Sequence, residues 1–328
     1  EKIKGSKLMV GKKTPDDIVT ASRIPLLMNA SPYGTPNDLL AEALASIEGK
    51  PSPNPFNGNE ACDWGDALEG VILTTAAERL NLTDLKLEHD AVFHDTLPFA
   101  VSLDGTADGG LGHEVTTDPA KGIYCVDGPV WVDGVGVLES KLTSSKPEDR
   151  PAPHRGPLQL QGQLMATKLT WGAVCVLYGG VELRIFLYQA NASTQSRITD
   201  EIEEFERRKF DVDWYPIQSS SDGNTAYPRV DDGAPPITLE GEDNDWLAQL
   251  VNAKDAKRAA EGDIDEAEAM LKERLGSHDE ATGMVGNRYY YVKWPMRNFK
   301  AQAAKTTPAK PARIARQGTL TIKEARDD

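Results

Sequence analysis

The sequence of 328 residues contains little cysteine, few aromatic side chains and no long apolar run. Its three cysteines, Cys62, Cys125 and Cys175, are scattered and include no CxxC pair. This spacing disfavours a disulfide framework, a cysteine-held zinc site and an iron–sulfur cluster. No apolar run approaches the roughly 20 residues that a membrane-spanning helix needs, and the first residues lack the apolar core of a secretory signal. We therefore expect a soluble, cytoplasmic protein that does not engage a membrane.

Basic side chains are also scarce, because 36 Lys and Arg stand against 51 Asp and Glu, for a formal net charge of -15. This balance disfavours a protein that coats nucleic acid nonspecifically with its whole surface. It leaves room for a local basic channel around an acidic site. Residues 297–328 differ from the rest of the chain, since they hold eight Lys and Arg against three Asp and Glu.

Helix and strand signals follow one another along the chain. The segment Thr35-Pro36-Asn37-Asp38 has the Thr N-cap, the first-turn Pro and the acid of a helix start. Further helices are predicted over about 60–80, 156–169 and 246–275, the last with a break at Gly262-Asp263. Strands are predicted over 99–104, 123–126, 130–132, 135–142, 173–178 and 181–188. The order predicts an α/β (α+β) fold, with a central mixed β-sheet flanked by helices on both faces and a helical C-terminal part.

Three glycine-containing dipeptides predict hairpin turns between neighbouring strands, at Asp127-Gly128, Asp133-Gly134 and Gly179-Gly180. Composition predicts the division of the chain. We expect a core domain over 1–217 and an acidic linker over 218–245, which is rich in Ser, Gly, Pro and Asp. A helical segment over 246–296 that packs on the core is expected next, followed by a basic, flexible tail over 297–328.

The stretch GVGVLESKLT, residues 134–143, places two opposite charges on one apolar strand. Because strand side chains alternate between faces, Glu139 and Lys141 share a face, roughly 7 Å apart along the strand. If that face is buried, both charges must be paired or used in chemistry. On an edge strand with one wet face, the same two residues would be ordinary surface groups.

Four short motifs around this strand resemble one family when taken in order. They are Trp-Gly-x-x-Leu-Glu ending at Glu69, Leu-Asp-Gly around Asp104, Leu-Glu-x-Lys around Glu139, and Gln-x-Gln-x-Gln-x-x-x-Thr starting at Gln159. Over residues 20–190 the chain resembles the PD-(D/E)XK nucleases, and within them the lambda-exonuclease and YqaJ-like phage recombination exonucleases. The resemblance implies a restriction-endonuclease-like nuclease core over 1–217, in the cytoplasm of a bacterium or of a phage-infected host. The gap between Asp104 and Glu139 is long, which leaves Asp133, and less so Asp108, as competitors for the aspartate role.

The resemblance implies a catalytic set of Asp104, Glu139, Lys141, Glu69 and Gln159. Asp104, Glu139, the Ser140 backbone carbonyl and Glu69 are the expected metal ligands. The expected cofactor is Mg²⁺, with two ions per site and with Mn²⁺ as a substitute, because Mg²⁺ prefers oxygen ligands and can activate water and neutralise phosphate. Lys141 is expected beside the attacking water, either as a base or as an electrostatic anchor.

The resemblance also implies partners. Double-stranded DNA ends are the expected substrate, digested from the 5′ terminus, with Ser22, Arg23, Lys146, Arg150 and Arg155 binding DNA phosphates. A single-strand annealing protein is an expected partner, and a homotrimeric ring with a basic central channel is the expected assembly. Two alternatives stay open: another enzyme of the same superfamily, such as an endonuclease or a helicase-associated nuclease, and a non-catalytic protein that binds DNA ends with the same fold.

Overall fold

The computed structural model describes residues 17–55, 58–87, 90–229 and 233–296, and the chain divides into two compact units, 1–228 and 229–328. The first unit is built on a six-stranded sheet with the order β2-β5-β9-β10-β11-β7. These strands are Thr83–Lys86, Gly105–Asp108, Val135–Thr143, Trp171–Tyr178, Glu182–Gln189 and Ile123–Cys125. The β9–β10 and β11–β7 pairs are parallel and the other pairs are antiparallel. The predicted central mixed sheet is confirmed.

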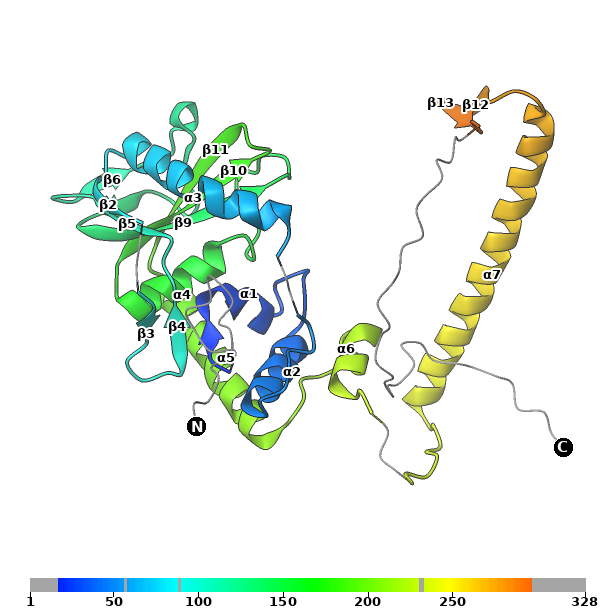
Figure 1. The fold of residues 1–328 in the computed structure, drawn as a ribbon, viewed down its shortest axis with the longest axis horizontal. Coiled ribbons are helices and arrows are strands. Elements are labelled where there is room, and N and C mark those ends of the chain that lie inside the picture. The colour runs from blue at the N-terminus through cyan, green and yellow to red at the C-terminus, as the bar shows by residue number, and fades with distance from the viewer. Residues whose placement is uncertain (1–16, 56–57, 88–89, 230–232, 297–328) are drawn as a thin grey trace, which may run out of the picture. The chain divides into compact units, whose positions relative to one another are not determined.

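Two apolar layers cover the faces of this sheet (Figure 1). On one face, α3 (Glu60–Arg79) contributes Ile72 and Leu73, which belong to a buried cluster with Leu138 and Ile185 of the sheet. On the other face lie α1 (Ile24–Leu27), α2 (Pro36–Ile47), α4 (Pro157–Thr167) and α5 (Ala192–Asp211). The predicted helices on both faces are therefore confirmed.

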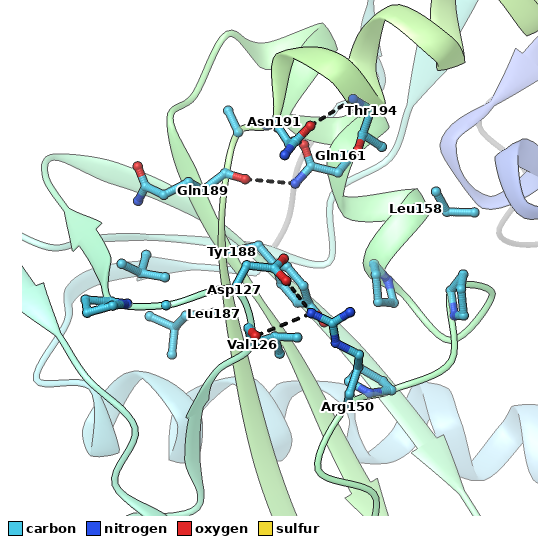
Figure 2. A pocket seen from close by; sticks show the side chains of 17 residues that line it. Val126, Asp127, Arg150, Leu158, Gln161, Leu187, Tyr188, Gln189, Asn191 and Thr194 are labelled. Atoms are coloured by element: carbon cyan, nitrogen blue, oxygen red, sulfur yellow. Dashed lines mark hydrogen bonds and ion pairs between the residues drawn. The ribbon is translucent and has the colours of Figure 1, made fainter.

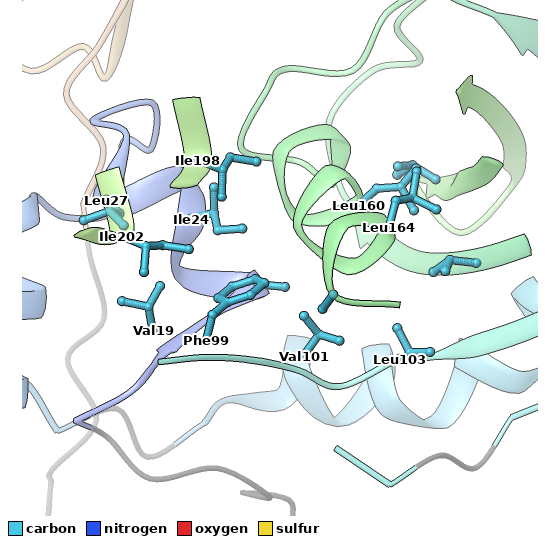
Figure 3. Packing of buried hydrophobic residues seen from close by; sticks show 14 of the residues in the cluster. Val19, Ile24, Leu27, Phe99, Val101, Leu103, Leu160, Leu164, Ile198 and Ile202 are labelled. Carbon is cyan, nitrogen blue, oxygen red and sulfur yellow. The ribbon is translucent and has the colours of Figure 1, made fainter. Parts of the chain in front are cut away.

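The layer around α4 fixes the helix that approaches the charged strand. Leu160 and Leu164 of α4 are buried among apolar side chains from several elements, including Ile24 and Phe99 (Figure 3). Phe99 lies on β4 (Phe99–Val101), the middle strand of a small sheet with β1 (Val19–Thr20) and β3 (Val92–Phe93). Because both leucines are fully buried, α4 cannot rotate without exposing them.

Two of the three predicted hairpins are wrong. The strands β7 and β8 (Val130–Val132) flank Asp127-Gly128 but do not pair, since β7 pairs with β11 and β8 pairs with β6 (His113–Val115). Likewise β8 and β9 flank Asp133-Gly134 and lie in different sheets. Gly128 and Gly134 do take positive φ values, so these glycines mark reversals of the chain and not the strand pairing. The hairpin at Gly179-Gly180 is confirmed by the β10–β11 pair.

The helix predicted at Thr35 is the capped helix α2. The Thr35 side chain accepts a hydrogen bond from the Asp38 backbone, and the Asp38 carboxylate accepts one from the Thr35 backbone. The range predicted as a linker, 218–245, contains a short helix, α6 (Ser220–Ala226), which contacts α2. The division between the two units, after Pro228, also falls within that range.

A buried carboxylate attaches α6 to α2. Asp222 is 2% exposed and accepts hydrogen bonds from Thr35 Oγ1 at 2.6 Å and Asn37 Nδ2 at 3.1 Å. We predict that Asp222→Ala lowers the free energy of unfolding by about 2–3 kcal/mol, because it leaves buried donors without their acceptor. Urea unfolding of the full chain measures this. The matched control is Asp200→Ala, at an exposed position on α5. Equal stability of the two variants would contradict the prediction.

The described residues of the second unit form one long helix and one hairpin. Helix α7 (Glu242–Leu275) runs through Gly262 without interruption, so the predicted break is wrong. An interior glycine costs a helix only about 1 kcal/mol. After α7, β12 (Glu280–Val285) pairs with β13 (Arg288–Lys293) in an antiparallel hairpin. This hairpin lies in the range predicted to be helical, and the predicted tail over 297–328 lies outside the described residues. Among the described residues, no helix combines the length and the apolar character that a membrane crossing would require.

Candidate active site

Strand register brings Asp104 and Glu139 together in the middle of the large sheet. Asp104 immediately precedes β5, and β5 pairs with β9 so that Gly105 lies opposite Leu138. The next step of this antiparallel register places Asp104 beside Glu139. The Ser140 backbone N–H donates a hydrogen bond of 2.8 Å to Asp104 Oδ2. The turn between β4 and β5 therefore attaches the aspartate directly to the charged strand.

The same register separates the two competing aspartates from Glu139. Asp108 lies at the far end of β5, opposite Val135, and its Oδ1 accepts a hydrogen bond from the Gly110 backbone. Asp133 precedes β9, six residues before Glu139 in the chain, and its side chain is exposed. Of the three candidates, Asp104 is the aspartate that the structure places next to Glu139.

Glu139 is fully buried and its carboxylate has two side-chain partners. Lys141 Nζ forms an ion pair with Oε1, and Gln163 Nε2 donates a hydrogen bond of 2.6 Å to Oε2. The Glu139 carboxylate is therefore buried, and both of its oxygens have a partner, as a buried charge requires. Lys141 is 29% exposed along its side chain. The pair therefore joins a fully buried carboxylate to a partly buried ammonium group.

Crowding of negative charge shapes the electrostatics of this site. Burial, and next the charge of Glu139, raise the pKa of Asp104 to about 8, against the opposing effects of Lys141 and the Ser140 N–H. Burial works to lower the pKa of Lys141, but Glu139 and Asp104 outweigh it, so that this pKa is raised. Glu69, on α3, is half-buried and its charge contributes to raising both values. The lysine is a cation that only partly compensates the carboxylates.

We predict that Asp104→Asn stabilises the metal-free protein by about 1–2 kcal/mol, because the amide removes a crowded charge and keeps an acceptor for Ser140. When the pKa of a carboxyl is raised in the folded state, the folded protein is destabilised as the pH rises from the pKa of the unfolded chain, about 4, towards the folded-state pKa of about 8. The gain in Tm should therefore be small at pH 5 and largest near pH 8 or above. Thermal melts in EDTA measure it, and a gain that shrinks as pH rises would contradict the prediction.

The glutamine that reaches the carboxylates is Gln163 and not the predicted Gln159. Gln163 is fully buried and also donates to the Ser102 carbonyl at 3.1 Å, while its Oε1 has no partner among the described residues. Gln159 lies one helical turn earlier on α4 and is only partly buried. The sequence did contain a signal for this choice. Around the axis of α4, Gln163 lies at a smaller angle from the buried Leu160 and Leu164 than Gln159 does.

The five predicted phosphate-binding residues lie on several separate elements. Ser22 is exposed on the short helix Ala21–Arg23, and Arg23 Nη2 donates to Glu42 Oε2 at 3.0 Å. Arg150 pairs with Asp127, and Arg155 pairs with Glu148. Lys146 is exposed on the loop that follows β9. Each of the three arginines is thus held by an acidic side chain in the structure.

A cavity of about 410 Å³ lies beside α4 (Figure 2). Gln161 lines it and donates to the Gln189 carbonyl at 2.9 Å. Because residues two positions apart on a helix are rotated by about 200° around its axis, Gln161 and Gln163 leave α4 in nearly opposite directions. Arg150 and Asp127 also line this cavity, whereas Asp104 and Glu139 do not.

No group of three His, Cys, Asp or Glu side chains within the described ranges is placed to hold a metal ion. The structure brings Asp104 and Glu139 into one site, with Glu69 close enough to influence both Asp104 and Lys141. The three cysteines are free thiols, and Cys175 is buried. Oxygen atoms of carboxylates, amides and backbone are therefore the donors that this site offers.

The fold and the site define an α/β protein whose mixed sheet carries a carboxylate pair and a lysine where β5 and β9 meet. The sequence model of the YqaJ-like viral recombinase domain matches residues 12–170, which cover this site. The resemblance to YqaJ-like proteins is confirmed over these residues. No curated protein matches the sequence.

Solved structures similar to this chain include an alkaline exonuclease from Laribacter hongkongensis, at 16% identity, 60% coverage of this chain, 90% coverage of that chain and a TM-score of 0.44. The same enzyme in complex with dAMP is 16% identical and covers 60% of this chain and 89% of its own, with a TM-score of 0.43. A phage-related exonuclease from Haemophilus somnus 129PT is 10% identical and covers 60% of this chain and 94% of its own, with a TM-score of 0.41.

Proposed function

We propose that this protein is a Mg²⁺-dependent deoxyribonuclease that digests the ends of linear double-stranded DNA during phage-type recombination. The observation that carries the proposal is the Asp104, Glu139 and Lys141 cluster, inside a segment that matches a recombinase family. Two carboxylates beside a lysine are the groups that phosphodiester hydrolysis needs, because they can hold a metal ion and the lysine can neutralise phosphate.

The residues of the site fit a divalent cation. Asp104 and Glu139 stand together with Lys141 paired to Glu139, and burial, and next the charge of Glu139, raise the pKa of Asp104. The unpartnered Oε1 of Gln163 is a further hard oxygen beside Glu139. Mg²⁺, or Mn²⁺ in its place, would be held by Asp104, Glu139 and the Ser140 carbonyl, with Glu69 serving a second ion. When bound, the metal supplies an activated water and neutralises charge on the phosphate.

The remaining groups have roles as positioning and electrostatic residues. Gln163 fixes the orientation of Glu139, because it donates to Oε2 while it is itself held by the Ser102 carbonyl. Lys141 already donates to Glu139, which supports the anchor role over the role of base. We assign Gln159, one turn away on the same side of α4, to contact with substrate.

The form of the substrate decides between this proposal and its alternatives. Linear duplex and covalently closed plasmid are incubated with the full chain in Mg²⁺ and, in parallel, in EDTA. We expect Mg²⁺-dependent loss of the linear duplex while the plasmid stays intact. Nicked or cut plasmid would instead identify an endonuclease of the same superfamily. Retention of both DNAs in Mg²⁺, together with binding to DNA ends, would identify a non-catalytic end-binding protein.

Digestion from the 5′ terminus predicts a preference for a 5′-phosphate. If Ser22, Arg23, Lys146, Arg150 and Arg155 bind terminal phosphate, DNA must first displace acidic partners such as Glu42 and Glu148 from the arginines. We expect 5′-phosphorylated duplex to be digested about tenfold faster than 5′-hydroxyl duplex, the effect of roughly 1.4 kcal/mol from one charge-assisted contact. Initial rates on otherwise identical duplexes measure this. Equal rates, or a preference for 3′-phosphate, would contradict it.

We also propose a closed homotrimeric ring around the duplex and a single-strand annealing protein as a partner. A subunit of net charge -15 is a poor clamp for DNA by itself, and a ring can gather its few basic groups into one channel. Lys146, Arg150, Arg155 and the basic residues from Lys300 to Arg326 are the candidate channel groups. Light scattering tests the ring, because a mass near one 35.7 kDa chain with distributive cleavage would reject it.

A further inference from the structure

The β12–β13 hairpin presents two tyrosines on one open face. Tyr289 and Tyr291 alternate with Tyr290 along β13, so the first two share a face and Tyr290 points to the other. The exposed fractions agree with this, since Tyr289 and Tyr291 are each 77% exposed and Tyr290 is 47% exposed. The cross-strand partners Met284 and Thr282 complete the open face. The opposite face carries Val292, which is partly buried.

This face has the composition of a base-stacking surface. Isolated hairpins are marginally stable in water and seldom keep large apolar side chains exposed without a use. Here the exposed groups are planar rings, on which any base can stack whatever its sequence. Tyr289 and Tyr291 are two strand residues, or roughly 7 Å, apart, about twice the 3.4 Å rise per nucleotide of a strand in duplex DNA. Successive bases could reach both rings only from an extended single strand.

The charge in this part of the sequence also favours nucleic acid. From residue 281 to the end, the sequence holds ten Lys and Arg against three Asp and Glu, in a chain whose net charge is -15. Arg288 and Lys293 stand at the two ends of β13. Lys293 pairs with its cross-strand neighbour Glu280 at 2.7 Å. Arg288, next to Tyr289, therefore supplies positive charge beside the exposed rings, which complements a phosphate backbone with its bases turned towards the protein.

We propose that the hairpin face of Tyr289 and Tyr291 binds single-stranded DNA by stacking. This rests on the proposed function in one respect: the ligand is taken to be the strand that remains when an end of the duplex has been digested. A duplex is a poor ligand for the same face, because its bases are stacked on one another and only its edges and phosphates are accessible. The face should therefore bind the single-stranded product and not the duplex substrate, because only the single strand has accessible base surfaces.

Fluorescence anisotropy with the full chain in EDTA tests this, with a short labelled oligothymidylate and a blunt duplex as probes. Tyr289→Ser/Tyr291→Ser should bind the oligothymidylate at least about tenfold more weakly than the unmodified chain, since stacking on each ring is lost. Tyr289→Phe/Tyr291→Phe keeps the rings and should bind like the unmodified chain. Tyr290→Ser removes the same side chain from the opposite face and should also bind normally. Affinity for the duplex should be unchanged in all three variants.

Three outcomes would overturn the inference. They are an unchanged single-strand affinity of the double Ser variant, an equal loss of its affinity for duplex, and an equal loss of single-strand affinity in Tyr290→Ser. If the first came with a smaller mass of the double Ser variant in light scattering, a second copy of the chain would be what covers this face. Because EDTA prevents turnover, the binding result is independent of cleavage. A chain that cleaves nothing but shows tyrosine-dependent binding would refute the proposed function and leave this site intact.

Discussion

Glu139→Gln is expected to reduce cleavage of linear duplex DNA by roughly a thousandfold or more, equivalent to about 4 kcal/mol of transition-state stabilisation. The amide keeps the size of the side chain and its oxygen can still accept from Lys141, while its NH2 group can donate to Gln163 Oε1 once the Gln163 amide turns, so the buried site should keep its shape. It removes one of the two charges that would hold the metal. Asp104→Asn should have a comparable effect, since its hydrogen bond from Ser140 is retained while the charge is lost.

Initial rates in Mg²⁺ and circular dichroism of both variants check this prediction. Asp133→Asn and Asp108→Asn are matched controls, because they remove the same charge from positions at the other ends of β9 and β5. Either amide variant at Asp104 or Glu139 that retains more than about a tenth of the wild-type rate would refute the assignment. If Asp133→Asn were the inactive variant instead, the metal role would belong to Asp133.

Lys141→Ala is expected to destabilise the metal-free protein by about 2–4 kcal/mol, because it leaves the fully buried Glu139 carboxylate without its cation. The value is at the lower part of the range for buried pairs, since the lysine side chain is 29% exposed. The Tm in EDTA should fall by roughly 5–15 °C. Mg²⁺ should restore much of this loss, because a bound cation replaces the missing charge and stabilises the folded state by mass action.

Thermal melts of Lys141→Ala with and without Mg²⁺ measure both effects, and cleavage assays should show a large loss of rate even where metal is bound. Lys146→Ala, at an exposed loop position, is the control for the stability measurement. A calorimetric titration in which Lys141→Ala had lost its metal affinity would contradict the role of Lys141 beside the nucleophile and phosphate. An unchanged Tm in EDTA would contradict the pairing with Glu139.

Much of the fold follows from local sequence signals. The Thr35 capping box, the buried helix stripe of Leu160 and Leu164 and the turn at Gly179-Gly180 each specify a structure within a few residues. The pairing of β7 with β11, and of β8 with β6, depends on contacts between residues distant in the chain. A glycine that permits a positive φ does not determine which strand the chain joins afterwards. The break predicted at Gly262 is wrong for a local reason, because one interior glycine costs a helix only about 1 kcal/mol.

The site was predictable in its residue types and less so in its geometry. The alternation in GVGVLESKLT correctly places Glu139 and Lys141 on one face. The burial of Glu139 shows that this face is buried and paired, and is not the wet face of an edge strand. The aspartate could not be chosen from spacing, because the choice depends on the register of β5 against β9. Gln163 was missed in favour of Gln159, although the phase of the helix relative to Leu160 contains that information.

Isothermal titration calorimetry of Mn²⁺ into the full chain measures whether Asp104 and Glu139 together hold the metal. We expect binding by the unmodified chain and by Asp133→Asn, and loss of that binding in both Asp104→Asn and Glu139→Gln. Full Mn²⁺ affinity in those two variants, or its loss in Asp133→Asn alone, would refute this assignment of the metal ligands.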